Sequence, residues 1–256
     1  MANAATGASR MRDIAGEHLA ALNAGTAEAR TLTEALAIDH RILLAAAVPE
    51  ATPTLTAAIA AAQELGILKR MTAIGAAVHA HLSPAEIARL RTHPSDTVRG
   101  WACFAVGADP HADVAALLAG IRPLADDERF TVREWAWMGI RAGLTRHLPE
   151  AIAQLTPWTA EASANLRRFA SEALRPRGVW AAHIAALKTT PQLGEPLLEP
   201  LRSDPERYVQ DSVANWINDA AKSQPGWARG LCDRWLAESP VSATERIVAR
   251  GLRSLS

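Results

Sequence analysis

The polar and apolar positions of the chain follow a helical period and repeat along it. An apolar residue, an arginine and, two positions after that arginine, an aromatic residue open segments at Val98, Val132 and Leu166. These starts lie 34 residues apart, and a related segment with glutamine in place of the arginine begins 43 residues later at Val209. A repeat of this length with two helical patterns per unit predicts a curved stack of helix pairs, each burying its apolar face against its neighbours.

Helical patterns also precede the first of these segments, at residues 10–24, 31–47 and 55–81. Pro49, Pro53, Pro84 and Pro94 separate helices, and Ser83 with Glu86 has the spacing of a capping box. Alanine is abundant and β-branched runs are scarce, which favours helices over sheets. We therefore expect an all-α protein with a single domain over 1–256, of which residues 1–9 are disordered.

Charge and cysteine content indicate where the protein works and which cofactors it lacks. The net charge is zero, but residues 1–128 carry 10 basic and 14 acidic groups and residues 129–256 carry 17 and 13, so positive charge gathers in the second half. Cys103 and Cys232 form no CxxC or zinc spacing. The N-terminus lacks an apolar signal core and no long apolar stretch occurs. We expect a cytoplasmic protein with no metal, no cofactor and no membrane partner.

The segment 165–180, NLRRFASEALRPRGVW, combines the residue types that suit an anionic polymer. Its arginines are planar cations shaped for phosphate, and its tryptophan follows them in a connection, where it could stack on a nucleotide. Glu172 would repel such a ligand, which indicates a chemical role. Pairing with Arg168 on an exposed helix face explains Glu172 equally well. The four arginines are Arg167, Arg168, Arg175 and Arg177, and the tryptophan is Trp180.

Two further groups carry candidate chemistry. Glu134 starts an inner helix beside Trp137, although with Thr131 it could instead close a capping box. Asn215 and Asp219 continue a polar stripe with Asp211 at intervals of four residues, a pattern that is usually a solvated face. Carboxylates in a basic groove would suit cleavage of a glycosidic bond, because its transition state carries positive charge on the sugar.

With these residues in view, the chain resembles the AlkC branch of the DNA alkylation repair glycosylases built from HEAT-like repeats. The resemblance spans nearly the whole chain, and RRFASE followed by RPR and a tryptophan is its most specific part. It implies a right-handed superhelix with a concave basic groove. It also implies the short form of the family, without a C-terminal immunoglobulin-like domain.

The resemblance implies an enzyme of base excision repair that excises 3-methyladenine and 3-methylcytosine from duplex DNA without flipping the base into a pocket. Its partner would be double-stranded DNA with alkylated bases, and the protein would be a monomer with no obligate protein partner. Carried over by residue, the catalytic carboxylates are Glu134, Glu172 and Asp219, the lesion contacts are Trp180, Trp137 and Asn215, and the phosphate contacts are Arg133, Arg167, Arg168, Arg175 and Arg177. A non-catalytic repeat protein that binds DNA or acts as a scaffold is the alternative.

Overall fold

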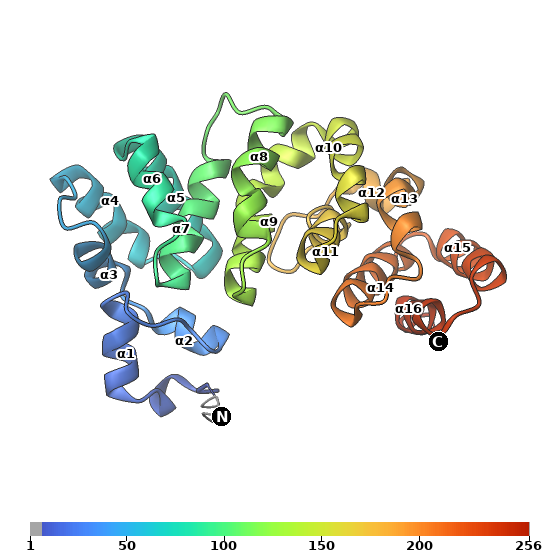
Figure 1. The fold of residues 1–256 in the computed structure, drawn as a ribbon, viewed down its shortest axis with the longest axis horizontal. Helices are drawn as coiled ribbons and strands as arrows, with labels where there is room; N and C mark the ends of the chain where they lie inside the picture. Colours follow the sequence, from blue (N-terminus) through green and yellow to red (C-terminus); the bar gives the residue numbers. More distant parts are fainter. Residues whose placement is uncertain (1–6, 256) are drawn as a thin grey trace. The chain divides into compact units, whose positions relative to one another are not determined.

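The computed structural model describes residues 7–255, and every regular element among them is a helix. The all-α prediction is therefore confirmed for this part of the chain (Figure 1). The helices form two compact units. Unit 1 runs to Ala112 and includes Asp127–Ile140, and unit 2 combines Asp113–Asp126 with the chain from Arg141 onward.

Unit 1 contains most of the helices of the first half of the chain. Its elements are η1 Met11–Asp13, α1 Gly16–Asn23, α2 Leu32–Ala37, α3 His40–Ala47, α4 Pro53–Gln63, α5 Ile67–His81, α6 Pro84–Leu90, α7 Asp96–Gly107 and the first part of α9 Phe130–Arg146. The capping box predicted at Ser83 and Glu86 is present, and Pro53 and Pro84 occupy the first turn of α4 and α6.

Two expected long helices of unit 1 are each split in two. The pattern 31–47 becomes α2 and α3, because Asp39 caps a new helix by accepting a hydrogen bond from the Arg41 N–H. The pattern 55–81 becomes α4 and α5, and Gly66 takes the extended conformation of an N-cap residue between them. The apolar period continued across both breaks, so periodicity alone did not reveal them.

Close helix contacts in unit 1 depend on glycine. A Cβ atom on Gly139 of α9 would lie 2.5 Å from the carbonyl oxygen of Cys103 in α7, and one on Gly75 of α5 would lie 2.3 Å from Phe104 of α7. Side chains at these positions would force the helices apart. Trp101 is fully buried here, and its indole N–H donates a 3.0 Å hydrogen bond to Nδ1 of the buried His40.

Unit 2 contains the helices of the second half. Its elements are α8 Val114–Ala125, the end of α9, α10 Leu148–Leu155, η2 Thr156–Ala160, α11 Ala164–Glu172, α12 Ala185–Thr189, η3 Pro191–Gly194, α13 Glu195–Leu198, η4 Glu199–Leu201, α14 Arg207–Ala221, α15 Pro225–Glu238 and α16 Ser242–Gly251. Helix α14 contacts both α11 and α16, and α15 packs on α14 and α16. The segments that the sequence aligned to one another begin α7, α9, α11 and α14.

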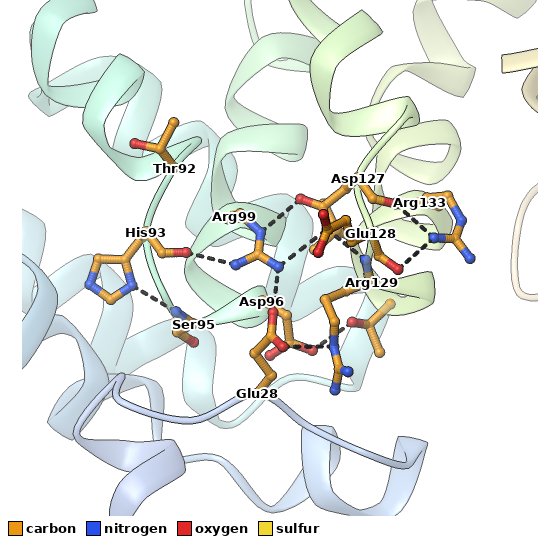
Figure 2. Close-up of polar contacts among 12 residues, drawn as sticks. Glu28, Thr92, His93, Ser95, Asp96, Arg99, Asp127, Glu128, Arg129 and Arg133 are labelled. Atoms are coloured by element: carbon orange, nitrogen blue, oxygen red, sulfur yellow. Dashed lines mark hydrogen bonds and ion pairs between the residues drawn. The ribbon is translucent and has the colours of Figure 1, made fainter. Parts of the chain in front are cut away.

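The repeated arginine closes the loop before its own helix. In unit 1, Arg99 donates to the carbonyl oxygen of His93 at 2.7 Å and to Asp127 (Figure 2). It also donates to the carbonyl oxygen of Pro94 at 3.2 Å. Arg133 donates in the same way to the carbonyl oxygens of Asp127 and Glu128 (Figure 2). Each time the acceptors lie six and five residues before the arginine, so the repeat seen in the sequence is a repeated loop contact.

The same contact recurs in unit 2. Arg167 donates to the carbonyl oxygens of Glu161 and Ala162 and, through Nε and Nη2, to both carboxylate oxygens of Asp204. Gln210 takes this place in the last repeat, because its side-chain amide donates to the carbonyl oxygen of Asp204 at 2.8 Å. A glutamine can therefore replace the arginine at this position.

The beginning of the described chain is held by hydrogen bonds. The expectation of disorder over residues 1–9 lies outside the described residues for 1–6. Within the described part, the N–H of Ala8 donates to Glu34 at 2.8 Å, and the Thr31 hydroxyl donates to the Ala8 carbonyl oxygen at 2.7 Å. None of the helices in the described part is long and apolar enough to cross a bilayer.

Candidate functional site

Glu172, the last residue of α11, is a buried carboxylate with three partners. The Ser212 hydroxyl of α14 donates to Oε2 at 2.7 Å and Arg175 donates to Oε1 at 2.7 Å. Arg168, one turn earlier, has Nη2 3.6 Å from Oε2. Pairing with Arg168 therefore exists, but Glu172 is only 3% exposed, so the alternative of an exposed salt bridge is wrong.

Asp219 of α14 is the second buried carboxylate of unit 2. Both Nε and Nη2 of Arg175 reach its Oδ2, at 3.0 and 2.9 Å. One guanidinium thus binds two carboxylates that are 47 positions apart in the chain, Glu172 and Asp219. The two carboxylates that the sequence placed in one site do lie together.

Burial and neighbouring positive charges shift the pKa values of Glu172 and Asp219 in opposite directions. Burial raises the pKa of Glu172, but Arg168, Arg175 and the Ser212 hydroxyl outweigh it, so the pKa lies below the usual value and the carboxylate is ionised at neutral pH. For Asp219 burial prevails over the lowering effect of Arg175, and its pKa is raised. When both acids are ionised, the charges of Arg168 and Arg175 balance those of the two carboxylates.

The prediction that Arg175 binds DNA phosphate needs correction. Its side chain is 9% exposed, and its donors point to Glu172 and Asp219 inside the protein. Arg167 is corrected for the same reason, since four hydrogen bonds tie it to Asp204 and to the preceding loop. Arg133 also has loop carbonyl oxygens as partners.

Arg168 and Arg177 lie beside the carboxylate pair. The Arg168 guanidinium lies 4.4 Å from the ring centre of Tyr208, in addition to its approach to Glu172. Arg177 is half-buried and donates to the Asp219 carbonyl oxygen at 3.1 Å and to the Ser223 hydroxyl at 2.7 Å. The contact of either arginine with a DNA phosphate stays a prediction.

Trp180 is displayed at the surface in a strained conformation. Its side chain is 51% exposed, and among the described residues it is the only non-glycine residue with positive φ, at 61°. Left-handed backbone costs a bulky residue about 1–2 kcal/mol, so the surrounding structure must enforce it. An exposed aromatic held at a cost in this way is typical of a binding surface.

Buried Arg141 holds the segment that carries Trp180. It donates to the carbonyl oxygens of Ala173, Arg175 and Ala182 at 2.6, 2.5 and 3.3 Å. A Cβ atom on Gly178 would lie 3.2 Å from Cζ of Arg141, so the loop packs directly on the guanidinium. Sequence reasoning missed Arg141, because nothing in its own repeat distinguishes it from a surface arginine.

Ser212 was also missed, although a signal was present. It precedes Asp219 by seven residues, the spacing that places two side chains on one face of a helix. The polar stripe of α14 is therefore divided. Ser212 and Asp219 face the carboxylate site, whereas Asp211 and Asn215 contact arginines of α16 and the turn after it. Asn215 accepts a 2.9 Å hydrogen bond from Arg253, and its contact with a lesion stays a prediction.

Glu134 and Trp137 belong to unit 1. The indole N–H of Trp137 donates to Oε2 of Glu134 at 2.8 Å, and the ring is 1% exposed, so the structure does not support Trp137 as a lesion contact. The capping-box alternative for Glu134 is wrong as well, because α9 already begins at Phe130 and the Thr131 hydroxyl donates to Asp96. The convergence of Glu134 with the carboxylates of unit 2 stays a prediction.

Comparisons with known proteins bear on the fold. No protein-family model matches the chain. Over 128 residues, half of this chain and 35% of the relative, it is 37% identical to the uncharacterized protein YhaZ of Bacillus subtilis (strain 168). Among solved structures it is similar to the Pseudomonas fluorescens alkylpurine DNA glycosylase AlkC bound to DNA containing an abasic site analogue, with a TM-score of 0.65 and 23% identity. That match covers 97% of this chain and 65% of the AlkC chain.

A second solved structure agrees with the first. AlkD2 from Streptococcus mutans matches with a TM-score of 0.61 and 16% identity over 78% of this chain and 98% of its own. The chain has the all-helical, HEAT-like AlkC/AlkD fold. The resemblance inferred from the repeats and from RRFASE is confirmed at the level of this fold.

The described residues contain no group of three or more histidine, cysteine, aspartate or glutamate side chains arranged to hold a metal ion. Both cysteines are buried thiols, and burial raises the pKa of Cys232 to about 12, so this thiol is protonated at neutral pH.

Proposed function

We propose that the chain is a DNA glycosylase of base excision repair that hydrolyses the N-glycosidic bond of cationic alkylated bases in duplex DNA. The observation that carries the proposal is the pair Glu172 and Asp219, two carboxylates gathered around one arginine on the AlkC/AlkD fold. Ionised carboxylates stabilise positive charge that develops on a sugar.

The chemistry requires little beyond charge and position. When the C1′–N bond breaks, its electron pair neutralises the positive charge of the alkylated base, so the base leaves without a proton from the protein. Positive charge then spreads over C1′ and the ring oxygen of the sugar, where ionised Glu172 and Asp219 stabilise it electrostatically. Water adds to C1′ and releases one proton, so the products are an abasic site and a neutral base.

Trp180 would provide contact with the damaged nucleotide. Its exposed ring lies on the loop that follows Arg175, and base–aromatic stacking contributes about 1–3 kcal/mol. We include Glu134 among the proposed catalytic carboxylates. Arg133, Arg168 and Arg177 are the proposed contacts with the DNA phosphates. The lesions we propose are 3-methylcytosine and 3-methyladenine.

One observation favours a non-catalytic DNA-binding protein instead. Glu172 and Asp219 are nearly fully buried and bind Arg175. A purely structural ion-pair network has the same features. Incubation with duplex DNA that carries one 3-methylcytosine, followed by quantification of the free base, separates the two. Release above the spontaneous rate supports the glycosylase, and DNA binding without release supports the alternative.

A further inference from the structure

Three arginines, here called the α16 arginine row, lie on α16 and in the turn after it, on the side of α14 that carries Asp211 and Asn215. Arg246 and Arg250 lie one turn apart on one face of α16, and Arg253 follows in the turn after the helix. Helix α14 contacts both α11 and α16 and is drawn between them in Figure 1. The three lie in unit 2, together with Glu172 and Asp219.

The row holds more positive charge than its contacts on α14 neutralise. Arg246 donates to Oδ1 of Asp211 at 2.7 Å, and Nε of Arg250 lies 3.0 Å from the same oxygen. Arg253 donates to the neutral amide oxygen of Asn215 at 2.9 Å. One carboxylate thus serves two guanidinium groups and an amide serves the third, which leaves an excess of two positive charges on this part of the surface.

The row remains accessible in spite of these contacts. Side-chain exposure is 46% for Arg250 and 41% for Asp211, and Arg253 is exposed. Exposed ion pairs of this kind contribute little to stability. Holding the fold together therefore does not account for the three arginines of this row, whereas an anionic polymer lying across them would.

We propose that the α16 arginine row, chiefly Arg250 and Arg253, binds phosphates of the DNA strand on one side of the lesion. This inference rests on the DNA-binding part of the proposed function and extends the contact surface beyond α11. Asn215, the partner of Arg253, precedes Asp219 by four residues, about 6 Å along the helix. This rise is the offset along the axis of α14, which a DNA strand spans in about two nucleotides.

Asp211 has a definite role in this arrangement. Its carboxylate holds Arg246 and Arg250 in place in the free protein, and it would compete with phosphate for them. Removing its charge therefore favours DNA binding, whereas a purely structural role predicts weaker or unchanged binding. Only the proposal predicts tighter binding.

The test is DNA binding measured by fluorescence anisotropy with a labelled duplex that contains an abasic-site analogue, over a series of salt concentrations. Arg250→Gln/Arg253→Gln is compared with Arg229→Gln, which alters an exposed arginine on α15 outside the row. Loss of each phosphate contact reduces the magnitude of the negative slope of log K against log salt by about 0.9. We therefore expect a reduction of about 1.8 for the double variant and no change for Arg229→Gln. A double variant with the slope of the unaltered protein overturns the proposal.

Asp211→Asn provides the second arm, with Glu245→Gln, an exposed acid of α16, as its control. Tighter binding by Asp211→Asn than by Glu245→Gln supports the proposal, and equal or weaker binding overturns it. Base release is measured on the same proteins. Release with unchanged slopes overturns only the arginine row, whereas altered slopes without release overturn only the glycosylase.

Discussion

Replacement of Arg175 by methionine tests whether the carboxylate pair depends on one guanidinium. Methionine keeps a long side chain but removes the donors that lie 2.7 to 3.0 Å from Glu172 and Asp219. Two buried carboxylates then lose their shared cation. Breaking a buried ion pair from one side typically costs about 3–5 kcal/mol, so we expect Arg175→Met to lower the free energy of unfolding by that amount at neutral pH.

The pH dependence of this loss has a definite sign. In the unaltered protein the pKa of Glu172 is lowered, so its ionised form stabilises the fold above the unfolded-state pKa of about 4.3, and that stability is lost as the pH falls through the folded-state value. Without Arg175, burial raises the pKa of the carboxylates and they take up protons more readily. The difference between variant and unaltered protein is therefore largest at neutral pH and shrinks as the pH falls.

Urea unfolding followed by circular dichroism and by tryptophan fluorescence measures the effect at neutral pH and at about pH 5. Because the chain contains two compact units, coincidence of the two probes decides whether one transition or two are fitted. Arg229→Met on α15 is the control and should change stability by less than about 0.5 kcal/mol. An exposed ion pair contributes less than about 1 kcal/mol. If Arg175→Met lowers the free energy of unfolding by less than this, Arg175 does not stabilise Glu172 and Asp219 as a buried ion pair.

Three further outcomes are expected. Trp180→Gly should be more stable than Trp180→Ala by about 1 kcal/mol in thermal or urea unfolding, because only glycine relieves the backbone at φ 61°; equal stability would mean that the loop is unstrained. The single-turnover rate of base release should fall on the acid side with a midpoint above about 3.9, because burial raises the pKa of Asp219, and a rate that stays constant to about pH 4 would contradict this. Burial, and then the charge of Arg70, lowers the pKa of His40 from 6.5 to about 4. Stability from the neutral imidazole is thus present above pH 6.5 and lost toward about pH 4, about 3 kcal/mol in all, and His40→Gln should flatten that part of the stability–pH curve.

Much of the fold was predictable from the sequence, because the repeated residues make the same contact in each repeat. The arginine that follows Val98, Val132 and Leu166 binds the loop before its own helix. The phosphate contacts predicted for Arg133 and Arg167 did not take this loop contact into account. The sequence contained a signal for this role. Asp127 lies six residues before Arg133 and binds Arg99 of the preceding repeat. Asp204 lies six residues before Gln210 and binds Arg167 of the preceding repeat.

The candidate site was predictable in composition and less so in geometry. Glu172 and Arg175 are neighbours on a helical turn, so their pairing follows from spacing. The bond from Arg175 to Asp219 spans 44 residues and depends on how α11 and α14 pack, which local patterns do not encode. The positive φ of Trp180 runs against the preference of its residue type, so only tertiary contacts such as those of Arg141 can impose it.

Free base released under single-turnover conditions, by the unaltered protein and by Glu172→Gln, tests the central proposal most directly. Glutamine preserves the shape of Glu172 and removes the charge that would stabilise the sugar cation. The proposal predicts release of 3-methylcytosine by the unaltered protein, and loss of that release in Glu172→Gln with DNA affinity and helical content retained. Equal release by both proteins, or none by the unaltered protein while it binds the duplex, would contradict it.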